Sequence, residues 1–125
     1  MSAKVDGVLL ECSIVTAGFF PDGGKTTIQI LGNKGEAGFS LMIDDFKGVG
    51  TYNTSDSNMA IYLTNVSGTG TFMSTAKGTI KVTSYTAENN ITGTFEFEGE
   101  NLATSVIKNI TEGKFSINLA KVKVP

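Results

Sequence analysis

The chain has 125 residues and a formal net charge of -2, with 40% apolar and 18% charged residues and no histidine, arginine or tryptophan. This composition is too apolar for a disordered segment and fits one globular domain covering residues 1–125. A nucleic-acid reader usually carries an arginine-rich basic stripe, so we expect no nucleic-acid partner. Histidine is the commonest acid–base catalyst and metal ligand, and its absence predicts a non-enzymatic protein without catalytic, cofactor-binding or metal-binding residues.

The first third of the chain alternates between apolar and polar residues, which is typical of strands with one buried face. Residues 4–14 predict a strand that Asp6-Gly7 interrupts with a turn or bulge. We expect a loop at 19–24, where Pro21 and Gly23 supply turn residues. Residues 32–35 indicate a tight hairpin loop between two further strands. The inward residues expected on those strands are Ile28 and Ile30, then Phe39, Leu41 and Ile43.

The middle of the chain is more polar and richer in glycine. Residues 48–58 predict a loop that contains a short extended piece at Thr51-Tyr52. In the next strand we expect Met59, Ile61 and Leu63 to point inward, with Ala60, Tyr62 and Thr64 on the opposite face. Residues 67–70 then predict a turn into a short strand around Phe72.

From residue 78 to residue 119 the alternation is regular. Two strands are predicted at 79–85 and 91–98, joined by a turn at 88–90. The expected inward residues are Ile80 and Val82, then Ile91, Phe95 and Phe97, and finally Phe115, Ile117 and Leu119. Lys121 and Lys123 alternate with valines, which predicts a charged terminal strand that discourages edge-to-edge association.

The segment after Asn101 is compatible with two structures. Leu102, Val106 and Ile110 have helical spacing, but a strand also fits the last two. One regular strand cannot bury both Ile110 and Phe115, because they are an odd number of residues apart. A bulge at Glu112-Gly113 would resolve this conflict, and we therefore favour a bulged strand over a short helix.

Eight to ten short strands linked by short turns indicate sequential antiparallel pairing. Such a sheet must bury its apolar face against a second sheet or close on itself. The predicted fold is therefore all-β, either an antiparallel β-sandwich or a flattened up-and-down barrel.

Several polar clusters could carry chemistry, but each has a simpler structural explanation. The single cysteine, Cys12, is expected to pack as a small apolar residue at the end of the first strand. The Gly-x-Gly of residues 67–71 lacks the helix that a phosphate site needs. Asp44, Asp45 and Asp56 lack the regular spacing of a calcium loop, and Glu96, Glu98 and Glu100 are expected to form a solvated stripe.

Other residues are weaker candidates for binding. Asn-x-Ser/Thr triplets, which can accept glycans in secreted eukaryotic proteins, begin at Asn53, Asn65, Asn90 and Asn109. A further set of apolar residues falls outside the regular inward rows: Phe19, Phe20, Met42, Tyr62, Met73 and Tyr85. These side chains could line a ligand pocket or contact a partner, but we favour a second small core beneath the loops.

The order of short motifs resembles an uncharacterised all-β domain family of small lipoproteins from Bacteroidota. The motifs are Ala-x-Val-Asp-Gly at 3–7, Gly-Thr-Tyr at 50–52, Gly-x-Ile-x-Val-Thr-x-Tyr at 78–85, Ile-x-Gly-Thr-Phe-x-Phe at 91–97 and Thr-x-Gly-x-Phe at 111–115. The resemblance implies a domain in the periplasm or at the cell surface, tethered by a lipidated cysteine upstream of residue 1. It implies no catalytic residues.

The function expected from these features is binding rather than catalysis. The leading hypothesis is an envelope-associated β domain that binds a partner protein, a glycan or a small apolar ligand through loops or a sheet face. The alternative is a lipocalin-like small barrel that carries an apolar molecule, with Phe19, Phe20 and Met73 near its mouth. A filled interior would speak against this carrier.

Overall fold

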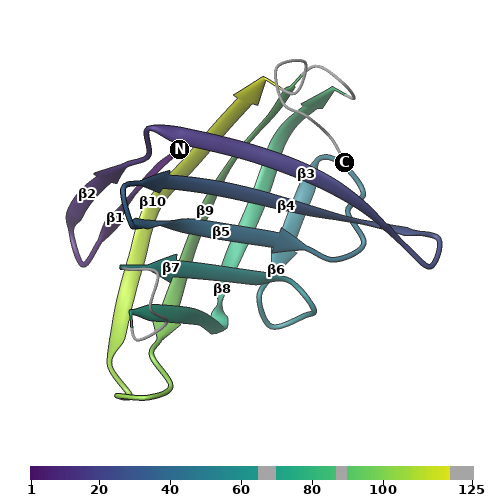
Figure 1. The fold of residues 1–125 in the computed structure, drawn as a ribbon. Coiled ribbons are helices and arrows are strands. Elements are labelled where there is room, and N and C mark those ends of the chain that lie inside the picture. Colours follow the sequence, from purple (N-terminus) through teal and green to yellow (C-terminus); the bar gives the residue numbers. More distant parts are fainter. Residues whose placement is uncertain (65–69, 87–89, 119–125) are drawn as a thin grey trace.

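The computed structural model describes residues 1–64, 70–86 and 90–118, and Figure 1 shows the arrangement of its strands. Within these residues, ten antiparallel strands form one sheet and no helix is present. The strands are β1 (Ser2–Val5), β2 (Val8–Glu11), β3 (Ile14–Asp22), β4 (Lys25–Lys34), β5 (Ala37–Ile43), β6 (Gly50–Asn53), β7 (Met59–Leu63), β8 (Thr71–Thr86), β9 (Asn90–Glu100) and β10 (Ile107–Asn118). The predicted all-β antiparallel class is confirmed.

The sheet curls strongly into a half-barrel. Its strand order is β2-β1-β10-β9-β8-β7-β5-β4-β3, and β6 pairs separately with β8. In Figure 1, β3, β4, β5 and β7 cross in front of β8, β9 and β10. The sheet therefore has two faces, a concave face that encloses the core and a convex face that points outward.

The chain turns one corner of the half-barrel at Cys12 and Ser13. The Cys12 amide donates a hydrogen bond to the Met1 carbonyl oxygen (2.8 Å), whereas the Ser13 amide donates to the Asn33 carbonyl oxygen (2.9 Å). The backbone thus changes its pairing partner from the β1 side to the β4 side between two consecutive residues. This corner connects the two ends of the strand order through the chain itself.

The concave face holds the core, and most of the predicted inward rows point there. The buried apolar side chains are Ala3, Ala17, Ile28, Ile30, Phe39, Leu41, Ile43, Ala60, Phe72, Ile80, Val82, Ile91, Phe95, Phe97, Ile110, Phe115 and Ile117. The Phe95 ring lies at the centre of an aromatic group, with ring centroids 5.5 Å from Phe39, 6.5 Å from Phe97 and 6.4 Å from Phe115. Alternation along β9, and along β10 on either side of its bulge, therefore fills the concavity with packed rings.

The prediction for β7 was wrong, because the strand faces the opposite way. Ala60 is completely buried, and Tyr62 packs inward against Phe39 with ring centroids 5.6 Å apart. Met59 and Ile61 accordingly point to the convex face. Both faces of β7 are apolar, so alternation alone could not choose between them. The register with β5, which pairs Ala60 with the buried Leu41, decides the direction.

Two predicted loops are shorter than expected. Residues 19–21 belong to β3, and the turn lies at Gly23 and Gly24, both with positive φ. Pro21 is tolerated there because β3 is an edge strand that pairs only with β4. The next turn lies at 35–36 rather than at 32–35, since β4 continues through Lys34.

Other predicted turns are confirmed. Asp6 and Gly7 form the tight turn between β1 and β2 with φ angles of 47° and 85°. The extended piece at Thr51-Tyr52 is β6. The predicted turns at 67–70 and 88–90 lie partly outside the described residues. Leu119, Lys121 and Lys123 lie wholly outside them.

The bulge predicted in the last long strand is confirmed. Ile110 pairs with Phe97 and Gly113 with Phe95, so Thr111 and Glu112 on β10 lie opposite the single residue Glu96 on β9, and β10 carries one extra residue there. Glu112 takes the left-handed conformation, with φ of 50°. Because of this shift, both Ile110 and Phe115 point into the core.

The loop before β10 contains no helix and is organised by Asn101, which is 4% exposed. Its Oδ1 accepts hydrogen bonds from the amides of Ala103 (3.0 Å) and Thr104 (3.2 Å), and its carbonyl accepts one from Ser105 (2.7 Å). These bonds replace the first turn of the alternative helix with an asparagine-centred turn.

We expect Asn101→Ala to lower the free energy of unfolding by about 1–2 kcal/mol, because it removes a buried acceptor and leaves two amides without it. Urea denaturation followed by circular dichroism measures the change. The control Thr104→Ala alters an exposed side chain in the same loop and should change stability by less than about 0.5 kcal/mol. Equal stability of Asn101→Ala and the wild type would contradict the role assigned to Asn101.

Candidate functional site

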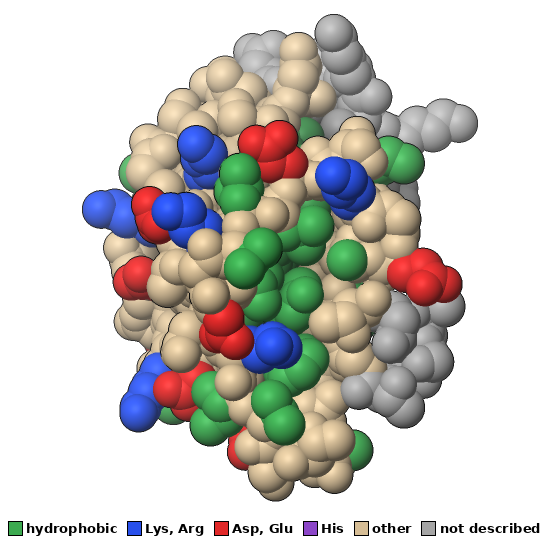
Figure 2. Space-filling model, turned by 90° about the vertical axis from the view of Figure 1, so that its left-hand side faces the viewer, with side chains coloured by type: hydrophobic (Ala, Val, Ile, Leu, Met, Phe, Trp, Pro, Cys, Tyr) green, Lys and Arg blue, Asp and Glu red, His purple; other side chains and the backbone are tan. Residues whose placement is uncertain are grey.

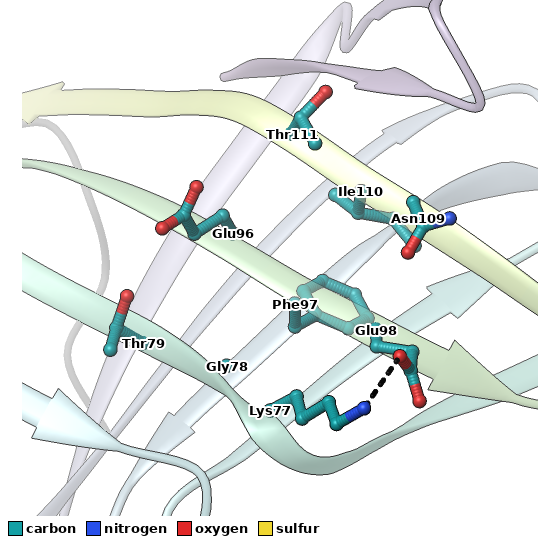
Figure 3. A pocket seen from close by; sticks show the side chains of 9 residues that line it. All are labelled: Lys77, Gly78, Thr79, Glu96, Phe97, Glu98, Asn109, Ile110 and Thr111. Carbon is teal, nitrogen blue, oxygen red and sulfur yellow. Dashed lines mark ion pairs between the residues drawn. The ribbon is translucent and has the colours of Figure 1, made fainter.

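The convex face of β8, β9 and β10 contains a shallow hollow of about 380 Å³, lined by polar side chains and by the apolar surface between them. Figure 3 shows its lining side chains on three neighbouring strands: Lys77 and Thr79 from β8, Glu96 and Glu98 from β9, and Asn109 and Thr111 from β10. Alternation produces this surface, because every apolar residue directed into the core leaves a polar neighbour pointing outward. The floor is the outer side of the backbone around Phe97 and Ile110.

This hollow continues along the sheet. A second hollow of about 470 Å³ shares Thr79 and Glu96 with the first and extends to Lys81, Thr94 and Lys114. A third, of about 380 Å³, shares Thr94 and Lys114 with the second and is also lined by hydroxyl-bearing side chains, namely Ser2, Thr83, Thr92 and Ser116. We call the three together the outer trough.

The outer trough follows β9 from Thr92 to Glu98, which corresponds to about 20 Å at the usual rise of a strand. β9 pairs with β8 on one side and with β10 on the other, so its backbone amides and carbonyls are engaged in the sheet. A bound molecule would therefore be recognised by side chains. Those available are hydroxyls, ammonium groups, carboxylates and one amide.

The charges in and beside the outer trough are partly paired. Lys77 Nζ lies 3.9 Å from a carboxylate oxygen of Glu98 (Figure 3), and Lys4 Nζ lies 2.9 Å from Glu112. The hydrogen bond from Lys4, together with its charge, lowers the pKa of the Glu112 carboxyl group. The bulge at residues 110–113 brings Glu112 next to β1, where it meets Lys4.

Glu96, Glu98 and Glu100 point outward as predicted. Glu96 is exposed, and Glu98 and Glu100 are half-buried. Only Glu96 and Glu98 line the outer trough, and Glu100 lies beside the outward-facing Met73. Sequence reasoning therefore identified two trough residues but interpreted them as an ordinary solvated stripe.

Asp44 and Asp45 of the central loop interact with different partners, and neither lines the outer trough. Asp44 accepts a hydrogen bond from the Thr27 hydroxyl (3.3 Å), and Asp45 forms an ion pair with Lys47 (3.5 Å). In residues 1–64, 70–86 and 90–118, no three histidine, cysteine, aspartate or glutamate side chains are grouped as metal ligands.

Cys12 is half-buried and packs against the core, as expected for a small apolar residue. Burial raises the pKa of its thiol, and the nearby amino-terminal charge only partly opposes this effect. The thiol form is thus favoured over the nucleophilic thiolate.

The apolar residues outside the regular rows are distributed over different surfaces. Phe19 and Tyr85 pack inward with Phe46 at one end of the core, with the Phe46 and Tyr85 ring centroids 5.0 Å apart. Phe20 is 40% exposed on the outer side of β3, and Met73 lies outward on β8. Phe19, Phe20 and Met73 therefore do not share one face, as the mouth of a barrel would require.

The Asn-x-Ser/Thr triplets are not all in turns. Asn109 lies within β10, whereas Asn53 and Asn90 lie at strand ends. Asn65 is outside the described residues. Asn109 lines the outer trough, which its triplet did not indicate.

A second surface of interest is the side of the half-barrel between its two crossing strand layers. Figure 2 shows hydrophobic side chains gathered along the middle of this face, with lysine and acidic side chains around them. On the edge strand β2, Val8 is 70% exposed and pairs with Val5 of β1, and Val5, Leu10 and Val15 are partly buried against the core. We call this surface the open side.

The fold and the outer trough together define a small all-β half-barrel domain with a shallow groove, lined by polar side chains, on its convex face. The chain belongs to the family described as a domain of unknown function, DUF6252, whose model matches residues 1–117. This match confirms the expectation of an uncharacterised domain. No curated protein and no solved structure is significantly similar to the chain. The described residues include no helix of the length and hydropathy needed to cross a bilayer.

Proposed function

We propose that this domain is a non-enzymatic binding module of the cell envelope, and that its outer trough holds an extended, hydroxyl-rich chain such as a glycan. The observation that carries the proposal is the continuity of three shallow hollows along β9, each lined by several polar side chains and overlapping the next by two residues. A surface of this length suits a polymer better than a small compact molecule.

The chemistry of the trough favours a glycan over an extended peptide. A peptide that binds a sheet usually adds to a free edge, where the backbone groups are unpaired. β9 lies in the interior of the sheet, with its backbone engaged on both sides. Threonine, serine and asparagine side chains instead offer donors and acceptors at many points, which matches the hydroxyl groups of sugars.

The proposal is tested by titrating the full chain with a panel of soluble neutral and acidic polysaccharides in affinity gel electrophoresis. Thr94→Met fills the middle of the trough and removes a hydroxyl, so we expect at least about tenfold weaker binding, equivalent to about 1.4 kcal/mol. Thr16→Met, on the outer side of β3, is the matched control and should bind like the wild type. The proposal fails if no polysaccharide binds or if Thr94→Met binds as well as Thr16→Met.

The envelope location forms part of the proposal and rests on the motif resemblance to small lipoproteins. Fractionation of cells expressing the complete native gene checks this part separately. We expect the protein in the membrane or periplasmic fraction, and accumulation in the cytoplasm alone would contradict the assigned location.

The open side favours a second candidate function, the binding of a small apolar ligand. Its support is the exposed Val8 beside the partly buried Val5 and Leu10. Against it, the concave side carries tightly packed rings around Phe95. Palmitate is a suitable probe, because its binding at the open side would perturb Val5 and Leu10 and leave Thr94 unchanged.

A further inference from the structure

We infer that the middle hollow of the outer trough is an anion subsite, and that the glycan it accepts carries carboxylate groups. The inference rests on the proposed function, because it names the chemical class of the ligand for the same trough.

The subsite is built by a row of three residues that the sheet places side by side. Lys81 on β8 pairs with Thr94 on β9, and Thr94 pairs in turn with Lys114 on β10. Neighbouring strands lie about 4.8 Å apart, so the two lysine backbones are separated by about 10 Å across Thr94. All three side chains are exposed and line the same hollow of about 470 Å³. Lysine ammonium groups on flexible stems can reach one anion from both sides of that hollow.

The ion pairs around the trough leave these two lysines available. Glu98 pairs with Lys77 and Glu112 with Lys4. Neither Lys81 nor Lys114 forms an ion pair with any residue in the described ranges. Glu96 and Glu112 also line this hollow, and the charge of Lys114 acts on Glu112, but Glu112 is paired with Lys4. Counting Lys4, three lysines face two carboxylates, an excess of one positive charge on a chain whose net charge is -2. This local reversal of charge is complementary to a carboxylate.

The neighbouring groups define the rest of the ligand. On one side, the Thr92 and Ser116 hydroxyl oxygens lie 3.2 Å apart, and the Thr83 hydroxyl donates to the Thr92 carbonyl oxygen (3.2 Å). These hydroxyls can contact uncharged sugar hydroxyls. Glu96, at the end of the middle hollow that adjoins the first hollow, is exposed and repels a second anion. The expected ligand therefore places one acidic group at the middle hollow and hydroxyl groups on both sides.

The experiment compares an oligomer of galacturonic acid with its fully methyl-esterified form, which keeps the sugar and removes the charge. Isothermal titration calorimetry of the full chain at low ionic strength should give about tenfold tighter binding of the acidic form, consistent with two exposed charge contacts. The preference should shrink at high salt, because exposed charges are screened. In the double variant Lys81→Gln/Lys114→Gln the two forms should bind equally.

The matched control is Lys25→Gln/Lys34→Gln, which removes two exposed lysines on β4, outside the outer trough. It should keep the preference of the wild type, and circular dichroism verifies that both double variants fold. The inference is overturned if the two oligomers bind the wild type equally, if neither binds, or if the control loses the preference too. Equal binding that Thr94→Met still weakens would overturn the anion subsite and leave the glycan-binding function intact.

Discussion

Replacing Phe95 with alanine is expected to lower the free energy of unfolding by about 4 kcal/mol. Phe95 is 3% exposed, and its ring contacts three other phenylalanine rings that come from β5, β9 and β10. Alanine would leave a cavity where the two layers of the half-barrel meet, and the surrounding strands are held by the sheet and cannot collapse into it. Urea denaturation followed by circular dichroism measures the loss.

Phe20→Ala is the matched control for Phe95→Ala. Phe20 is also a phenylalanine on a strand, but it points outward and is 40% exposed. We expect its replacement to change stability by less than about 1 kcal/mol. If the two variants lost equal stability, the assignment of inward and outward faces would be wrong.

Gly93→Ala is expected to destabilise the domain by about 3 kcal/mol through overpacking. A Cβ atom at this position would overlap the Lys81 carbonyl oxygen and lie 2.5 Å from Cζ of Phe115. The carbonyl belongs to the neighbouring strand and cannot move away without breaking the pairing. The absence of a side chain here is therefore what lets the Phe115 ring lie against β9.

Gly50→Ala is the control for Gly93→Ala, because it shows how much any glycine-to-alanine change in a strand alters stability without the contact to Phe115. Its new Cβ would have only the Tyr52 ring within reach, at 4.0 Å, and its φ angle is not in the left-handed region. Thermal unfolding should show a large decrease in Tm for Gly93→Ala and a small change for Gly50→Ala. Similar values for both variants would contradict the packing of Phe115 against Gly93.

Alternation predicted the inward residues of the sheet wherever only one face of a strand is apolar. Phe95, Phe97 and Ile117 are buried as expected, and the parity conflict between Ile110 and Phe115 correctly located the bulge. β7 shows where this reasoning stops. Its residues are apolar on both faces, so its direction depends on the register with β5, a long-range contact that no local pattern encodes.

The overall shape was predictable only as a choice between two architectures. A sandwich and a flattened barrel require the same alternation along each strand. The half-barrel arises because the backbone switches partners at Cys12 and Ser13, whose hydrogen bonds reach Met1 and Asn33. No residue type at this corner signals the switch, since it depends on which strands become neighbours.

The outer trough could not be predicted for the same reason. The sequence shows that Lys81, Thr94 and Lys114 each point away from the core, but it does not show that they lie in one row. Strand order and the bulge in β10 place them together and bring Glu112 next to Lys4. The sequence pattern predicts that each of the three side chains points outward. It does not predict that β8, β9 and β10 pair in the register that aligns them.

The most direct test of glycan binding in the outer trough is a ¹H–¹⁵N nuclear magnetic resonance titration of the full chain with an oligomer of galacturonic acid. We predict chemical-shift changes that saturate and centre on the amides of Lys81, Thr94 and Lys114, with little change on the outer side of β3 and β4. Changes confined to Val5 and Leu10 at the open side, or no change at any concentration, would contradict binding of this acidic glycan in the trough.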